Sequence, residues 1–341
     1  MPARLALPIW TGAEDDAVRA RVAIDGWAGS SQISALVDRF GGSVATRDPA
    51  ELLDWLDEFS GEHWDFRGGV ERNLAPRVTL PPGVEQLVFD VAPVLGMAGP
   101  YPLLRTSYDT ILMTGGMIRA EIVKPRFARE LLDSGVAARN IVFLGGFRTF
   151  AGDERELAPV FGVNGDNEFD AMVQGMQCAF GGPRGLPAPE ITGSGSDSVP
   201  DLGEGNGNWR VCEWVLGNQT LRVVAAPSSD PEHRRANTAD TYRFWADRVR
   251  GPGEHSVLVA TTPIYVPYQG AGAVEILGVE CGLAVETVGA SASASDLGEY
   301  SQVFLAQNHL QEIRSAIRAL RSLRTRLTTG ETRGSWPSST Q

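Results

Sequence analysis

The stretch from Asp109 to Arg148 constrains the fold of this chain more than any other. It contains a short apolar run that ends in Gly115-Gly116, a helical pattern of apolar residues, and a second apolar run that ends in Gly145-Gly146. Strand, helix and strand in this order form a βαβ unit, whose crossover makes the two strands parallel. We therefore predict an α/β fold: a Rossmann-like, doubly wound, mainly parallel sheet with an N-terminal helical extension and a C-terminal helix.

Both glycine pairs lie at the carboxyl ends of neighbouring strands in this prediction. Open α/β sheets bind ligands at that edge, because loops diverge there and helix N-termini point their N–H groups into the gap. Glycine lets the backbone approach a ligand closely, yet a glycine pair also serves simply to turn the chain from strand to helix. Gly115, Gly116, Gly145 and Gly146 are therefore candidate ligand-binding residues, with a structural turn as the alternative.

The composition excludes several classes of protein. The chain has 341 residues, 43% of them hydrophobic, which suits one large or two medium globular domains. Its formal net charge of -12 argues against sequence-independent binding to nucleic acid or to an anionic membrane. We expect no signal peptide in the acidic N-terminal stretch and no transmembrane helix, since no apolar run is long enough to span a membrane. The cysteines and histidines lack metal-ligand spacing. We expect a cytoplasmic protein with no metal site.

The chain is predicted to have four parts. Residues 1–100 form a helical and irregular N-terminal extension, and 101–290 form the Rossmann-like core with an insertion at 180–224. A C-terminal helix follows at 291–328, with a disordered tail at 329–341. The apolar run within Val84–Val94 is a candidate strand of the extension, and Trp209–Ala225 is typical of a β-hairpin.

A second candidate site lies where a predicted strand leads into a helix. Asn237 is placed to cap that helix, with Asp240 at capping-box spacing, so Asn237 and Thr238 mark either a helix start or a ligand contact. Arg234 and Arg235 stand just before it. Guanidinium groups beside a helix N-terminus suit a phosphate or carboxylate, but these arginines can equally pair with acidic residues of the chain.

Two further groups complete the candidate site. Thr261, Thr262 and Tyr265 follow a predicted strand and offer hydroxyls as a neutral hydrogen-bonding wall, with a proline-stiffened turn as the alternative. Glu168 opens a predicted helix, where a carboxylate favours the helix dipole. A general base is the functional alternative for this residue.

The order of these blocks resembles the family that contains YdcF, SanA and ElyC (domain of unknown function 218). The matching residues are Gly115-Gly116, Arg126, Gly145-Gly146, Glu168, Asn237-Thr238 and Thr261-Thr262. The similarity runs from Tyr108 to Val288, and Tyr265-Val266-Pro267-Tyr268-Gln269 stands where the family commonly has a His and an Arg. The resemblance implies a Rossmann-like fold and an anionic, nucleotide-like ligand. Binding of S-adenosylmethionine has been proposed in that family, so this molecule is a candidate cofactor, although the sequence leaves the cofactor open.

These features predict an enzyme, a hydrolase or transferase, that acts on a phosphorylated or nucleotide-type small molecule. The glycines would cradle the ligand, Arg126, Arg148 or Arg235 would pair with its anionic group, and Glu168 would do acid/base work. The alternative is a protein that binds S-adenosylmethionine or a nucleotide without chemistry of its own. A third interpretation is a scaffold that pairs through its arginine-rich C-terminal helix, and a homodimer is a further expectation.

Overall fold

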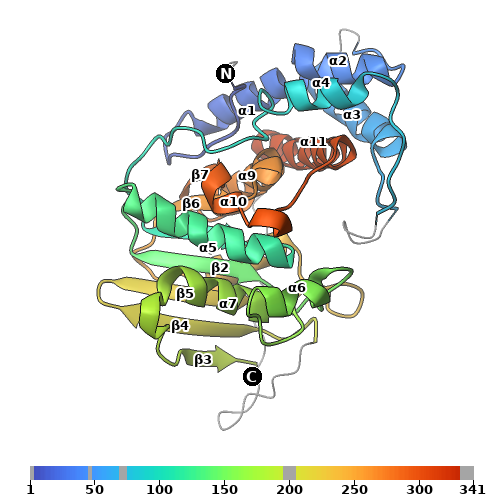
Figure 1. The fold of residues 1–341 in the computed structure, drawn as a ribbon. Coiled ribbons are helices and arrows are strands. Elements are labelled where there is room, and N and C mark those ends of the chain that lie inside the picture. Colours follow the sequence, from blue (N-terminus) through green and yellow to red (C-terminus); the bar gives the residue numbers. More distant parts are fainter. Residues whose placement is uncertain (1–3, 45–47, 69–74, 195–204, 331–341) are drawn as a thin grey trace. The chain divides into compact units, whose positions relative to one another are not determined.

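The computed structural model describes residues 4–44, 48–68, 75–194 and 205–330. Seven strands follow the order β3-β4-β5-β2-β1-β6-β7 (Figure 1). The pairs β1–β2, β1–β6 and β2–β5 are parallel, and the pairs β3–β4 and β4–β5 are antiparallel. The strands are β1 (Thr110–Thr114), β2 (Asn140–Gly145), β3 (Glu190–Gly193), β4 (Arg210–Leu216), β5 (Gln219–Ala225), β6 (Ser256–Thr261) and β7 (Ala284–Gly289).

The predicted βαβ unit is present. Helix α5 (Ile118–Asp133) connects β1 to β2, and the two strands pair in register from Thr110 opposite Asn140 to Thr114 opposite Leu144. All five residues of β1 are buried, as expected for a central strand that is covered on both faces. The prediction of an α/β fold with a mainly parallel sheet is confirmed.

Contacts within the chain divide it into two compact units. The first comprises the described residues of Met1–Pro102, Thr262–Gly289 and Val303–Thr332, and the second comprises those of Leu103–Thr261 and Ala290–Gln302. These units reflect how densely the residues contact one another. They do not test the domain boundaries predicted from the sequence, which stay predictions. Within the described residues, no helix is long and apolar enough to cross a membrane.

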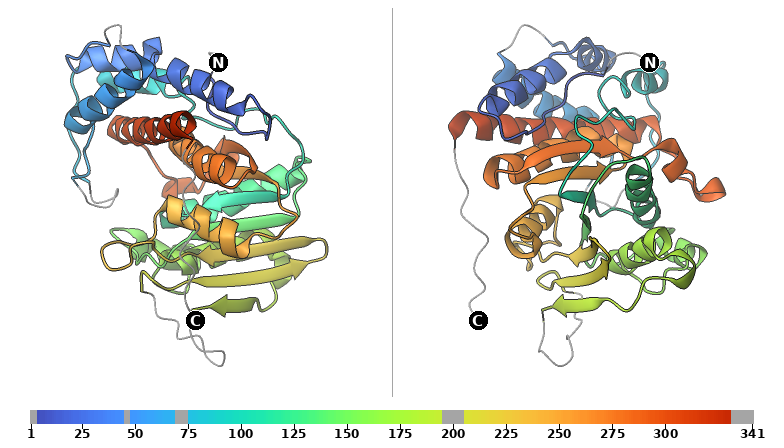
Figure 2. Two further views of the ribbon diagram at one scale, coloured as in Figure 1. Left: turned by 180° about the vertical axis from the view of Figure 1, so that it is seen from behind. Right: turned by 90° about the vertical axis from the view of Figure 1, so that its left-hand side faces the viewer.

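The second unit has helices on both faces of its strands. Helices α5 and α7 (Glu168–Phe180) cover one face, and α8 (Thr238–Phe244) continues into the π-helix η3 (Trp245–Val249) on the other face (Figure 2, right). The predicted hairpin is confirmed, because β4 and β5 pair around Gly217, whose φ is +60°. Smaller elements are α6 (Glu154–Val160), η2 (Gly182–Arg184), α10 (Ala292–Ser295) and η6 (Gly298–Tyr300). Residues 195–204 of the predicted insertion lie outside the described residues, as do 331–341 of the predicted tail.

The first unit is mainly helical and contains the predicted extension and C-terminal helix. Its elements are α1 (Asp16–Ala28), α2 (Ser31–Arg39), α3 (Pro49–His63), α4 (Val84–Val91), η4 (Pro263–Tyr265), α9 (Val266–Ala273), η5 (Val274–Glu280), β7 and α11 (Ala306–Thr329). The apolar side of α11 carries Leu310, Ile313 and Ile317, all fully buried, and this helix packs against α3 and α9. The predicted N-terminal helices and long C-terminal helix are therefore present, although α11 begins at Ala306 and not at the predicted position 291.

The candidate strand within Val84–Val94 is wrong, because Val84–Val91 forms helix α4. The run of apolar residues at 87–89 suggested a strand, but the buried residues are Val84, Val88 and Val91, at helical spacing. Phe89 is 44% exposed. A short apolar run does not by itself distinguish a strand from a helix.

The arginines of α11 pair within the first unit. Arg314 contacts Asp65, Arg321 contacts Asp54 and Asp57, Arg324 contacts Asp25, and Arg326 contacts Glu275 and Glu280. These partners come from α1, α3, η5 and the turn after α3. The arginine-rich helix thus has an internal role in holding its own unit together.

Candidate functional site

The two glycine pairs lie side by side at the carboxyl edge of the second unit's strands. Thr114 at the end of β1 is opposite Leu144 of β2, which brings Gly115 next to Gly145. A Cβ atom added to Gly115 would lie 3.0 Å from Cα of Gly145 and 3.0 Å from the carbonyl oxygen of Leu144. Even an alanine would therefore crowd the backbone of the neighbouring strand.

The side chain of Glu168 occupies the space beside these glycines. A Cβ atom on Gly115 would lie 2.2 Å from Oε1 of Glu168, and one on Gly145 would lie 3.2 Å from Cδ of Glu168. Asn167 caps α7 by accepting a hydrogen bond from the N–H of Asp170 at 3.1 Å, so that Glu168 begins the helix as predicted. Glycine at these two positions makes room for the carboxyl group.

The environment of Glu168 raises the pKa of its carboxyl group. The largest cause is burial, since only 7% of the residue is exposed. The positive charges of Arg148, Arg235 and Lys124 and the N–H of Gly146 oppose this effect without cancelling it. A carboxyl group with a raised pKa at a ligand-binding edge is a candidate general acid or base.

Two charged residues of α5, which were not among the residues predicted from the sequence, complete this group. Glu121 and Lys124 are both fully buried. Oε1 of Glu121 accepts a hydrogen bond from the N–H of Gly116 at 2.5 Å, whereas its Oε2 is buried and has no hydrogen-bond partner within the described residues. Nζ of Lys124 donates to the carbonyl oxygens of Thr114 and Gly115, the latter at 3.2 Å.

The pKa of Glu121 is raised well above its usual range. Burial is the main cause, and the nearby carboxyl of Glu168 raises it further. Lys124, Arg148 and the N–H of Gly116 act in the opposite direction. A signal for this pair exists in the sequence, because Glu121 and Lys124 stand among the apolar positions of a helix whose outer face is polar.

Arg148 follows the second glycine pair and is already paired. Its guanidinium group forms two hydrogen bonds with Glu154, of 2.6 and 2.8 Å, and donates to the carbonyl oxygen of Gly116 at 2.8 Å. Glu154 is fully buried and also accepts from the N–H of Ile118 at 2.9 Å, at the N-terminus of α5. Carboxylates of the chain itself, from Glu154 and Glu121, therefore occupy N–H groups that a ligand anion was expected to use.

Arg126 lies apart from this cluster. It is exposed on α5, and its Nη1 donates to the carbonyl oxygen of Asp296 at 3.5 Å. The residues just before it, Glu121 to Pro125, are buried, so position 126 falls on the outer side of the helix. The structure does not bring Arg126 together with the other predicted site residues.

The loop before α8 lies beside the second glycine pair. A Cβ atom on Gly146 would be 3.8 Å from Cβ of Ala236. Asn237 and Asp240 form the predicted capping box at the start of α8, where Thr238 is the first helical residue, with two hydrogen bonds of 3.0 Å. Arg234 pairs with Asp240. Arg235 is exposed, and its charge acts on the carboxyl of Glu168.

The predicted hydrogen-bonding wall is divided between the two units. Thr261 ends β6 in the second unit and is fully buried, where its Oγ1 accepts a hydrogen bond of 3.4 Å from the hydroxyl of Thr114. Thr262 and Tyr265 belong to the first unit. There the N–H of Tyr265 donates to the carbonyl oxygen of Thr262 at 2.9 Å, and the ring of Tyr265 packs edge-on against Phe304.

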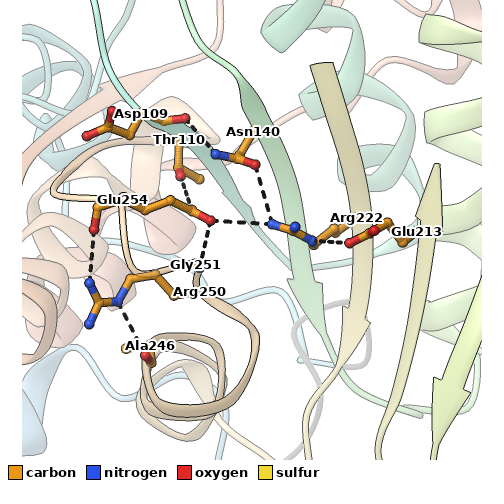
Figure 3. A network of polar contacts seen from close by, with 9 residues as sticks. All are labelled: Asp109, Thr110, Asn140, Glu213, Arg222, Ala246, Arg250, Gly251 and Glu254. Atoms are coloured by element: carbon orange, nitrogen blue, oxygen red, sulfur yellow. Dashed lines mark hydrogen bonds and ion pairs between the residues drawn. The ribbon is translucent and has the colours of Figure 1, made fainter. Parts of the chain in front are cut away.

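The amino edge of the same strands carries a different polar network (Figure 3). Oε1 of Glu254 accepts from the N–H of Gly251 at 2.8 Å and from Nη1 of Arg222 at 3.4 Å, while Oε2 accepts from the hydroxyl of Thr110. Arg222 also pairs with Glu213 of the adjacent strand, and Asn140 donates to the carbonyl oxygen of Asp109 at 3.1 Å. Each carboxylate oxygen of Glu254 thus has a donor, which is typical of a structural role.

Comparisons with known proteins place the chain in a family. A family model described as the Rv3785 N-terminal domain matches residues 11–96. The chain is 30% identical over 335 residues to uncharacterized protein Rv3785 of Mycobacterium tuberculosis and to uncharacterized protein Mb3814 of Mycobacterium bovis, and each match covers 90% of both chains. No solved structure matches. Among the described residues, no group of three or more His, Cys, Asp or Glu is arranged to hold a metal ion.

These matches overturn the resemblance to the YdcF, SanA and ElyC family. That resemblance rested on glycine turns, helix caps and a carboxylate at a helix start, which many connections between strand and helix require whatever the family. The expectation of S-adenosylmethionine rested on the resemblance alone and loses its basis with it. With 30% identity over 90% of both chains, this chain belongs to the family of the mycobacterial protein Rv3785.

Proposed function

We propose that the carboxyl edge of the second unit is the active site of an enzyme that acts on a phosphorylated or nucleotide-type small molecule. The reaction would be a hydrolysis or a group transfer. The observation that supports this proposal best is the carboxyl of Glu168, held beside two adjoining glycine turns with a raised pKa. Open α/β sheets bind their ligands at this edge.

Glu168 is the residue that we assign to acid/base work. A positioned group whose pKa is close to the working pH accelerates proton transfer by roughly 10²- to 10⁴-fold. Burial moves the pKa of Glu168 upward from the usual glutamate value, in the direction that this role needs. The residue is 7% exposed, whereas the neighbouring Glu121 is fully buried.

Arg235 is the residue that we assign to the anionic group of the substrate. Arg148 is bound to Glu154 by two hydrogen bonds, and Arg126 lies on the outer side of α5. Arg235 is exposed in the loop before α8, and its charge acts on Glu168. An arginine fork in this place suits a phosphate next to the acid/base residue.

A thermal-shift panel tests both assignments. Wild-type protein would be heated with inorganic phosphate, adenine and uridine nucleotides, and sugar phosphates, since a ligand of the folded state stabilises it by about 2.7 kcal/mol at 100 times its Kd. We expect one phosphorylated compound to raise the melting temperature, and Arg235→Ala to lose that shift. Arg126→Ala is the matched control, because it removes another exposed arginine and should keep the shift. A shift that survives in Arg235→Ala would contradict the assignment of the anion to this loop.

Incubation separates an enzyme from a binding protein. A compound that raises the melting temperature is left with the wild-type protein, and its products are followed by chromatography. Conversion of the compound supports the enzyme, and a stabilising compound that stays unchanged supports a nucleotide-binding protein without chemistry. The expected homodimer stays a prediction, which sedimentation velocity can check independently.

A further inference from the structure

The buried charges around the first glycine pair do not balance. Arg148 is engaged by Glu154 through two hydrogen bonds, so these two charges neutralise each other. What remains buried is the single ammonium group of Lys124 against the two carboxyl groups of Glu121 and Glu168. Arg235 is exposed, and its charge acts on Glu168 from outside this buried set. A cluster with one excess buried negative charge binds a proton more readily than it stays doubly ionised.

The two carboxyl groups differ in what surrounds them. Glu121 is fully buried, and its Oε2 has no hydrogen-bond partner within the described residues. Glu168 keeps an exposed fraction of 7% and has the N–H of Gly146 and the charge of Arg235 in its environment. An interior oxygen without a donor costs far more free energy when it is charged than when it is neutral. The excess proton therefore belongs on Glu121.

We propose that Glu121 stays protonated at neutral pH and is a positioning residue for Glu168. The two carboxyl groups, which flank Gly115 and Gly116, then hold one proton between them, and Glu168 is the member that ionises at the sheet edge. When Glu121 is neutral, the positive charge of Lys124 stabilises the ionised carboxyl group of Glu168. The catalytic importance of this arrangement rests on the proposed function, whereas the protonation of Glu121 does not.

The charged groups that face Glu121 come from three elements. Lys124 is on α5 itself, Glu168 is on α7, and Arg148 follows β2. Burial and Glu168 raise the pKa of Glu121 well above its usual range, although Lys124 and Arg148 oppose them. The contacts of the two carboxyl groups distinguish them: Oε2 of Glu121 is buried without a donor within the described residues, whereas Glu168 has the N–H of Gly146 beside it.

Carboxyl ¹³C NMR tests the proposal without any substrate. The protein is labelled with ¹³C at the glutamate carboxyl carbon, and the resonances are followed as the pH is raised through 7. We expect one resonance to remain at the protonated position at pH 7. It should vanish in Glu121→Gln and remain in Glu156→Gln, an exposed glutamate of α6. In Glu168→Gln it should titrate at a lower pH, because the like charge has gone.

Two results would overturn the proposal. One is a wild-type spectrum at pH 7 in which every glutamate carboxyl resonance is at the ionised position. The other is a protonated resonance whose midpoint does not move in Glu168→Gln, which would mean that the two groups are not coupled. Amide spectra check that each variant folds, and wild-type protein with Glu168→Gln decides the matter if Glu121→Gln does not fold. Because no ligand is needed, failure of the ligand panel leaves this result intact.

Discussion

At the amino edge of the second unit, both carboxylate oxygens of Glu254 accept hydrogen bonds, whereas at the carboxyl edge one oxygen of Glu121 has no partner within the described residues. The pKa values differ in the same way. Burial raises the pKa of Asp109 at the amino edge, but hydrogen bonds from His255 and Ser256 outweigh it and hold that pKa below the usual range. At the carboxyl edge, burial outweighs the favourable contacts of Glu121.

Buried carboxyl groups therefore serve two different purposes at the two ends of the same strands. Donors from β1, β5 and the loop before β6 satisfy Glu254, so that network ties strands together. The carboxyl edge holds glutamates in an environment that disfavours their ionised form, which costs stability and suits proton transfer. We therefore assign structure to the amino edge and chemistry to the carboxyl edge.

The largest expected loss of stability comes from breaking the buried ion pair between Arg148 and Glu154. Arg148→Met leaves the buried carboxylate of Glu154 without its guanidinium, and we expect a loss of about 3–5 kcal/mol in the free energy of unfolding. Urea denaturation measures it. Arg126→Met, on the exposed side of α5, should change the value by less than about 0.5 kcal/mol. Equal losses in the two variants would refute the structural role of Arg148.

A matched pair of substitutions contrasts the edges directly. Glu254→Gln removes a charge that Arg222 and the N–H of Gly251 stabilise, and should cost about 1.5–3 kcal/mol at pH 7. Glu121→Gln replaces a carboxyl group that must take up a proton when the protein folds at pH 7, so we expect the variant to lose no stability and to gain some. Denaturant midpoints at pH 7 compare them. A larger loss in Glu121→Gln than in Glu254→Gln would break the comparison.

The glycines at the carboxyl edge offer a test of packing. Gly115→Ala places a Cβ atom 2.2 Å from Oε1 of Glu168 and 3.0 Å from backbone atoms of β2, so we expect a loss of about 1–3 kcal/mol and a displaced Glu168. Gly146→Ala meets nothing nearer than 3.8 Å and should cost less. Thermal denaturation ranks the two variants. The opposite ranking would show that Glu168 does not lie against Gly115.

The two edges are also expected to differ in the pH dependence of stability. The pKa of Asp109 is lowered, so its contribution is present above the ordinary value of 3.8 and is lost as the pH falls through the folded-state value. The pKa of Glu121 is raised, so its contribution is present below the ordinary value of 4.5 and is lost as the pH rises through the folded-state value.

Unfolding free energies measured across this pH range show both slopes. Asp109→Asn should flatten the decline on the acid side, and Glu121→Gln should flatten the decline that begins above pH 4.5. Glu168 contributes to the second slope, so part of it should persist in Glu121→Gln. An unchanged slope above pH 4.5 in Glu121→Gln would remove Glu121 from this account.

The sequence predicted the strands and glycine turns of the candidate site better than it predicted the buried charged residues there. Two apolar runs that each end in glycines are enough to expect parallel strands, and their register then brings Gly115 to Gly145. Glu121 and Lys124 escaped notice because charged residues of a helix are ordinarily assigned to its solvent face. The partner of Arg148 could not be predicted either, since Glu154 reaches it across a loop with no repeating pattern.

Turnover in two glutamate variants tests the central claim most directly. The phosphorylated compound selected by the thermal-shift panel is incubated with wild-type protein, Glu168→Gln and Glu254→Gln, and product is measured at pH 7. The account predicts that Glu168→Gln still binds the compound but loses at least about 10²-fold in rate, while folded Glu254→Gln keeps the wild-type rate. An unchanged rate in Glu168→Gln would contradict the account, because the chemistry would then lie elsewhere in the molecule.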